Sequence, residues 1–164
     1  MTLQVFFAKA SWILLIIILM VRPLNDLFHH KILVLILRYR KYLGIACGLF
    51  AFLHVILFLT TTRGISDFFT NSLYWRFDNF FGWGSIALIL MFFPLITSNK
   101  FSQTRLKSYW KKIQQLSYPV FILVAVHVVL VKREFSASIP VIIWLILWIS
   151  AFFKKKYSRK SIIQ

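Results

Sequence analysis

The chain has 164 residues, of which 60% are hydrophobic and 15% are charged, and its mean hydropathy is +0.77. Soluble domains have about one half apolar and about one quarter charged residues, so this composition excludes an ordinary soluble domain. The net charge of +16 does not indicate a nucleic-acid partner or a disordered chain, because apolar runs such as 12–21 and 141–153 do not occur in solvated basic proteins. The expected partner of the cations is the lipid bilayer.

Five apolar segments are long enough, or nearly long enough, to cross a hydrocarbon core of about 30 Å, which takes about 20 helical residues. They lie at residues 5–24, 42–62, 80–98, 115–132 and 138–154. We therefore predict an all-α integral membrane bundle of about five transmembrane helices, with residues 1–164 forming one membrane domain. The first segment is followed by no small-residue cleavage site, so we expect an uncleaved span and not a signal peptide.

Two features refine these boundaries. The segment Lys31–Tyr42 alternates apolar residues with cations, which predicts a short helix or turn at the membrane interface and not a sixth span. Pro23 is expected to mark the exit of the first span, while Pro94 lies inside the third span and predicts a kink there.

The distribution of cations predicts the orientation. Fifteen of the 20 Lys and Arg residues fall in the link between the first and second spans, in the link between the third and fourth spans, and in the C-terminal tail. The remaining five fall on the opposite side of the membrane. The positive-inside rule then places the N-terminus outside and the C-terminus in the cytoplasm of a multi-pass inner or plasma membrane protein.

Two histidines stand inside the predicted spans, where ionisable residues are costly and indicate a ligand, a proton relay or a buried partner. His54 lies 12 residues after Tyr42, and His127 lies 12 residues after Gln115. Because both spans run in the same direction, each histidine is expected about 18 Å from the cytoplasmic end. Two neutral imidazoles at one level of a bundle are the axial ligands that a six-coordinate b-type haem needs.

Other interpretations of these residues stay open. An intramembrane histidine also forms hydrogen bonds with a neighbouring backbone or serine. For two histidines at different depths in the membrane, this structural role would be as strong an explanation as haem ligation. His29 and His30 lie in a basic link, where a solvated role at headgroup level is favoured over metal binding. Cys47 is the single cysteine, so an internal disulfide and covalent c-type haem attachment are excluded.

Several spaced residues resemble a known family. Residues 40–44, Arg-Lys-Tyr-Leu-Gly, followed by Leu53 and His54, resemble the Arg-Arg-x-Leu-Gly segment and haem histidine of the ferric reductase-like transmembrane domain. The family's later spacing is followed at Thr97, Ser98, Arg105, Leu106, Trp110, Tyr118 and His127. Within this family the chain most resembles the MsrQ or YedZ type, the haem-binding, quinol-oxidising subunit of a periplasmic methionine sulfoxide reductase system.

The resemblance implies a fold of the cytochrome b type and a role in electron transfer. His54 and His127 would be the axial ligands of the iron of one outer-side haem b. Electrons would pass from a quinol or flavin donor to a periplasmic or extracellular redox partner, and FMN or a quinone is a candidate second cofactor. Gln114 stands where the family has a histidine, which puts a second, cytoplasmic-side haem in doubt. No flavin or nicotinamide domain is apparent, so the chain would be one component of a transmembrane oxidoreductase.

Residues around the histidines are candidates for supporting roles. Arg63, Arg76 and Lys132 lie at the outer rim, where they could pair with haem propionates, with headgroup contact as an equally strong alternative. Gly44 and Gly48 put small residues near His54, which permits close helix packing or makes room for a porphyrin.

Two rival functions are kept. The first is a haem-less scaffold subunit of the same fold, for which the replacement by Gln114 is the argument. The second is a small transporter that uses the histidines as a proton relay. It is disfavoured because no acidic residue lies inside a predicted span.

Overall fold

The computed structural model of the protein describes residues 2–62 and 64–160, and these contain helices and no strands. The long helices are α1 (Leu3–Phe28), α2 (Lys31–Thr62), α4 (Phe80–Ile96), α7 (Ser117–Lys132) and α8 (Ile139–Lys160). Short elements connect them: α3 (Ile65–Thr70), η1 (Ser72–Trp75), α5 (Lys100–Leu106), α6 (Ser108–Gln114) and η2 (Phe135–Ser138). The predicted all-α fold is confirmed.

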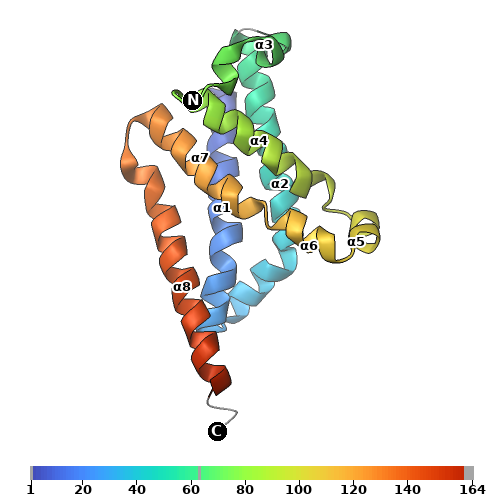
Figure 1. The fold of residues 1–164 in the computed structure, drawn as a ribbon, viewed down its shortest axis with the longest axis vertical. Coiled ribbons are helices and arrows are strands. Elements are labelled where there is room, and N and C mark those ends of the chain that lie inside the picture. Colours follow the sequence, from blue (N-terminus) through green and yellow to red (C-terminus); the bar gives the residue numbers. More distant parts are fainter. Residues whose placement is uncertain (1, 63, 161–164) are drawn as a thin grey trace.

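The helices form a membrane bundle. Within the described residues, four helical stretches are long and apolar enough to cross a membrane, and α4 with α5 makes a fifth when this pair, bent by 92°, is counted as one span. In Figure 1, α1, α2 and α8 run along the length of the molecule, while α4 and α7 lie obliquely beside them. The end that holds the start of α1 together with α3 is called the N-terminal end, and the opposite end, where α8 finishes, the C-terminal end.

One predicted boundary is wrong. The segment Lys31–Tyr42 is not a separate interfacial element, because α2 is one helix of 32 residues. Such a helix is about 48 Å long and exceeds the hydrocarbon thickness, and its first turns lean across the C-terminal end of the bundle (Figure 1). No glycine or proline interrupts its first turns, so good helix formers extend it without a break.

Pro23 does not end the helix of the first span, although the apolar run stops next to it, at Val21. It lies inside α1, which continues to Phe28 and ends at His29, a residue in the left-handed conformation with φ 47°. The His29 N–H donates to the Asn25 carbonyl at 2.9 Å. A proline removes a single hydrogen bond, and in a membrane helix the surrounding bundle tolerates that loss.

Pro94 lies inside α4, as predicted. Side chains that follow it satisfy the last carbonyls of the helix: the Ser98 hydroxyl donates to the Pro94 carbonyl at 2.6 Å, and the Thr97 hydroxyl donates to that of Phe93 at 2.7 Å. The helix ends two residues after the proline, at Ile96, and the chain then turns sharply into α5. The orphan carbonyls at this break are therefore not left unpaired in the membrane.

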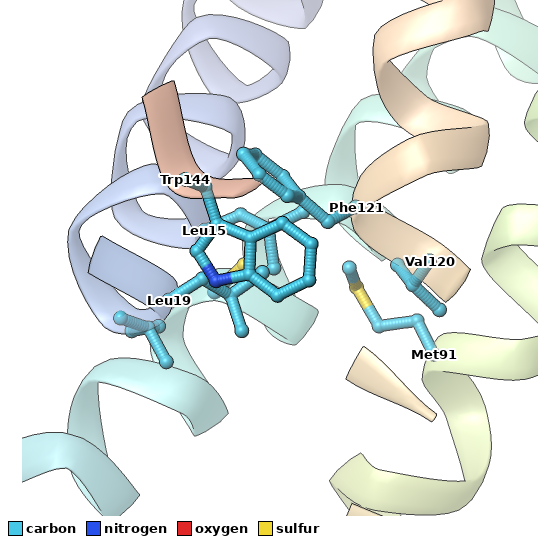
Figure 2. Packing of buried hydrophobic residues seen from close by; sticks show 8 residues of the cluster. Leu15, Leu19, Met91, Val120, Phe121 and Trp144 are labelled. Carbon is cyan, nitrogen blue, oxygen red and sulfur yellow. The ribbon is translucent and has the colours of Figure 1, made fainter. Parts of the chain in front are cut away.

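A small apolar core fixes the bundle (Figure 2). Figure 2 shows Trp144 of α8 beside Leu15 and Leu19 of α1, with Phe121 of α7 close by. Phe121 is fully buried and Leu19 is 1% exposed. A polar contact joins the two longest spans, since the Ser11 hydroxyl of α1 donates to the Cys47 carbonyl of α2 at 3.0 Å. Buried polar contacts of this kind are typical of helix pairs in membranes.

Gly82, in the first turn of α4, allows the loop before α4 to lie against the helix. A Cβ at this position would lie 2.0 Å from the Arg76 carbonyl oxygen, so backbone would have to move. We expect Gly82→Ala to lower the free energy of unfolding by about 1–3 kcal/mol, measured by thermal unfolding in detergent. Gly44→Ala is the control, because a Cβ at Gly44 meets no atom within 4 Å. Equal melting temperatures for the two variants would contradict the packing described.

Candidate functional site

The two intramembrane histidines are held in the same way. His54 lies on α2, and its Nδ1 is 2.9 Å from the Gln4 carbonyl oxygen at the start of α1. His127 lies on α7, and its Nδ1 is 2.7 Å from the Phe80 carbonyl oxygen at the start of α4. Both α1 and α4 begin at the N-terminal end (Figure 1). The structure therefore places both imidazoles towards that end of the bundle.

These contacts determine the tautomer of each ring. A carbonyl oxygen only accepts hydrogen bonds, so the hydrogen must be on Nδ1 in both imidazoles. A neutral imidazole with a hydrogen on Nδ1 carries its free lone pair on Nε2. Histidines that bind metal ions usually donate their other ring N–H to a carbonyl or carboxylate, which fixes the ring. Both His54 and His127 have this arrangement.

The helices that carry the histidines are separated by their neighbours. In the described part of the chain, α1 and α4 each pack against both α2 and α7, whereas α2 and α7 share no extended contact. Two imidazole ligands on different helices of a bundle are the arrangement that a planar group held between them requires.

Gly84 gives His127 its room. A Cβ at Gly84 would lie 2.8 Å from Nδ1 and 2.9 Å from Cε1 of His127, closer than any ordinary contact. The ring of Phe80 lies edge-on to the imidazole, with the centroids 5.9 Å apart. The absence of a side chain at Gly84 thus allows the imidazole to lie directly against the backbone of α4.

The start of α4 is itself fixed by its cap. The Asn79 side-chain oxygen accepts from the Phe81 N–H at 2.8 Å, and Trp83 Nε1 donates to the Phe77 carbonyl at 3.0 Å. Asparagine is a strong N-cap because it satisfies an orphan N–H of the first turn. These contacts position the Phe80 carbonyl, which in turn orients His127.

The predicted rim cations take different positions. Arg63 lies outside the described residues. Arg76 forms an ion pair with Asp78, and this hydrogen bond holds the pKa of the Asp78 carboxyl below its ordinary value. The Arg76 side chain is 63% exposed. Lys132 is exposed in the last turn of α7.

The other polar candidates have roles outside the histidine site. Gln114 donates to the Pro94 carbonyl and to the Thr97 hydroxyl, both at 3.1 Å, and so ties α6 to the end of α4. His29 and His30 are exposed in the turn between α1 and α2. Within the described residues, no group of three or more His, Cys, Asp or Glu side chains could hold a metal ion. His54 and His127 remain the candidate metal ligands.

Gly48 is a small residue of α2 that allows close helix packing. A Cβ at Gly48 would lie 2.9 Å from the side chain of Leu95 on α4. The space at Gly48 is therefore filled by Leu95.

Comparison with known proteins identifies relatives of the chain. Residues 6–125 match the family model described as ferric reductase like transmembrane component. A protein-methionine-sulfoxide reductase heme-binding subunit MsrQ of Agrobacterium fabrum is 30% identical over 119 residues, 72% of this chain and 53% of that protein. The MsrQ of Brucella anthropi is 30% identical over 130 residues, 78% of this chain and 56% of that protein.

The chain thus spans about half the length of the curated relatives it matches. No solved structure matches it. The family model nevertheless covers most of the chain, including α1, α2, α4 and most of α7. The chain is a multi-pass membrane protein and belongs to the family of ferric reductase like transmembrane components.

Proposed function

We propose that the chain is a membrane electron-transfer subunit that binds one haem b through His54 and His127. The observation that carries this proposal is the matched hydrogen bonding of the two imidazoles, which leaves both Nε2 atoms free for iron. The names of the two relatives, which describe them as heme-binding subunits, support the same conclusion.

The residues of this chain would hold, orient and shield the cofactor. Gln4 and Phe80 fix the two ring orientations through their carbonyl oxygens, and Gly84 leaves space beside His127. Aliphatic and aromatic side chains around a bound cofactor would exclude water and so influence its redox potential. A bound haem would supply a one-electron couple between ferric and ferrous iron.

The proposed direction of electron flow rests on the distribution of charge. The cations predict an N-terminus outside the inner or plasma membrane and a C-terminus in the cytoplasm. The imidazoles lie towards the N-terminal end, so the proposed haem lies nearer the outer face. We propose a quinol or a flavin as the electron donor and an acceptor on the outer face. The chain would bind FMN or a quinone as its second cofactor. A periplasmic or extracellular methionine sulfoxide reductase is the candidate acceptor, by analogy with the names of the relatives.

A haem-less scaffold is the second candidate, and Gln114 is the observation that favours it. Its amide is engaged with α4, so this residue supports helix packing and offers no imidazole. A proton relay has weaker support, because no hydrogen bond of the described residues joins His54 or His127 to a second titratable side chain.

Removal of either axial ligand tests the proposal. We expect His54→Ala and His127→Ala each to lose bound haem, because each substitution removes one of the two protein ligands proposed for the iron. The measurement is a reduced-minus-oxidised spectrum with a pyridine haemochrome assay on detergent-purified protein, and the native chain should contain about one haem. His30→Ala is the matched control, since His30 is exposed and should leave the content unchanged. Full haem content in either axial variant would overturn the assignment.

A second test addresses the orientation of His127. Gly84→Ala would place a methyl group within 2.8 Å of Nδ1, so the ring must move and its bond to the Phe80 carbonyl must weaken. Changes in such outer partners cost about 10- to 100-fold in metal affinity, and we expect a loss of this size in haem retention with a shifted Soret band. Gly44→Ala should retain the native spectrum, because its Cβ meets no atom and Gly44 precedes His54 by ten residues of α2, about 15 Å. Identical spectra for the two variants would contradict the proposed role of Gly84.

The role of Arg76 is open to an electrochemical test. If Arg76 stabilises a propionate, Arg76→Gln should lower the haem midpoint potential, because a nearby positive charge favours the reduced form. An exposed charge pair contributes up to about 1 kcal/mol, which corresponds to about 40 mV for one electron. Arg133→Gln, which removes another exposed cation, is the control for a general effect of charge. Equal shifts in the two variants would exclude a propionate contact.

A further inference from the structure

A second polar feature lies far from the histidines, at the C-terminal end of the bundle. A cavity of about 180 Å³ is formed between α1 and α8, with Tyr118 of α7 in its wall. Its charged lining residues are Arg22, Asp26 and Lys155, and its aromatic lining includes Trp144 and Trp148. None of these residues takes part in the candidate haem site, so the cavity needs its own explanation.

The cavity lies at the level of the lipid headgroups. The apolar run of α1 ends at Val21, directly before Arg22, and that of α8 ends at Phe153, directly before Lys154. Both helices therefore leave the hydrocarbon core at this level. The tryptophans in the wall agree with this depth, because Trp and Tyr concentrate at membrane interfaces. Trp148 is 50% exposed and borders the lipid.

The charged side chains of the cavity form no ion pairs within the described part of the chain. Arg76 and Asp78 form the single ion pair among the described residues, so no ion pair joins Arg22, Asp26 or Lys155. The neighbouring Lys154 differs, since its Nζ donates to the Leu27 carbonyl at 2.6 Å and caps the end of α1. The cavity thus keeps two cations and one carboxylate available, with one positive charge in excess.

The size and chemistry of the cavity indicate its occupant. Pockets for whole small molecules hold about 300 Å³ or more, so this cavity accommodates a polar head whose tails remain in the lipid. A guanidinium and an ammonium match a phosphate, while a carboxylate accepts hydrogen bonds from hydroxyl groups. Basic pockets between membrane helices on the cytoplasmic side bind anionic headgroups. We propose that this cavity binds a phosphatidylglycerol headgroup, with Arg22 and Lys155 on the phosphate and Asp26 on the glycerol hydroxyls.

Native mass spectrometry of the full-length protein in detergent tests this site. The probes are phosphatidylglycerol, phosphatidylcholine and phosphatidylethanolamine at equal concentration, and we expect retention of phosphatidylglycerol alone. Removal of one cation near the surface weakens anionic lipid binding about fivefold, so Arg22→Gln and Lys155→Gln should each lose about this factor. Lys156→Gln is the matched control, since it removes an exposed cation of the same helix outside the cavity lining.

Two further arms make the result decisive. The native chain should prefer phosphatidylglycerol to phosphatidic acid, which has no hydroxylated alcohol for Asp26, and Asp26→Asn should abolish this preference. Unchanged elution volume and haem content would show that the variants fold. Equal losses for Lys155→Gln and Lys156→Gln, or equal binding of all lipids, would overturn the proposal. Displacement of the lipid by a short-chain ubiquinone analogue would assign the cavity to a quinone and would overturn it as well.

Discussion

A neutral imidazole in a membrane has two nitrogens to satisfy, and each unsatisfied polar group in hydrocarbon costs several kcal/mol. In this chain a backbone carbonyl satisfies one nitrogen of each ring, at 2.9 Å for His54 and 2.7 Å for His127. The second nitrogen is the one that a metal would satisfy. The proposed haem site thus depends on two carbonyls, which lie at the starts of α1 and α4.

The start of α4 shows how a backbone group is placed with such accuracy. Asn79 caps the helix, and Gly82 lets the preceding loop approach so closely that a methyl group would overlap the Arg76 carbonyl. Gly84, one residue beyond Trp83, leaves the space that the His127 ring occupies. A change at Asn79 or Gly82 would reach the imidazole through the Phe80 carbonyl, whereas a side chain at Gly84 would meet the ring directly. Both glycines therefore help to position the imidazole of His127.

The sequence predicted the helical class, the approximate spans and the two histidines, because long apolar runs and buried ionisable residues are strong local signals. The hydrogen-bond partners of the histidines could not be predicted from the sequence. Every residue carries a backbone carbonyl, and the side chains of Gln4 and Phe80 do not indicate that their carbonyls accept these bonds. The full length of helices α1 and α2 could not be predicted for a related reason. Pro23 and the cations of Lys31–Tyr42 indicate breaks locally, but helix continuity depends on the neighbouring helices. The pairing of Arg76 with Asp78 was likewise not anticipated.

The two ends of the bundle differ in chemistry, and this difference constrains the proposed route of electrons. The imidazoles lie towards the N-terminal end, whereas the C-terminal half has Gln114 tied to the end of α4 by two hydrogen bonds. Gln114 offers no imidazole at this position, and the other two histidines, His29 and His30, are exposed in the turn between α1 and α2. Electrons for a single haem near the outer face would then have to enter from a carrier that reaches it directly. In the proposed orientation, a lipid-soluble quinol or a bound flavin would meet that requirement.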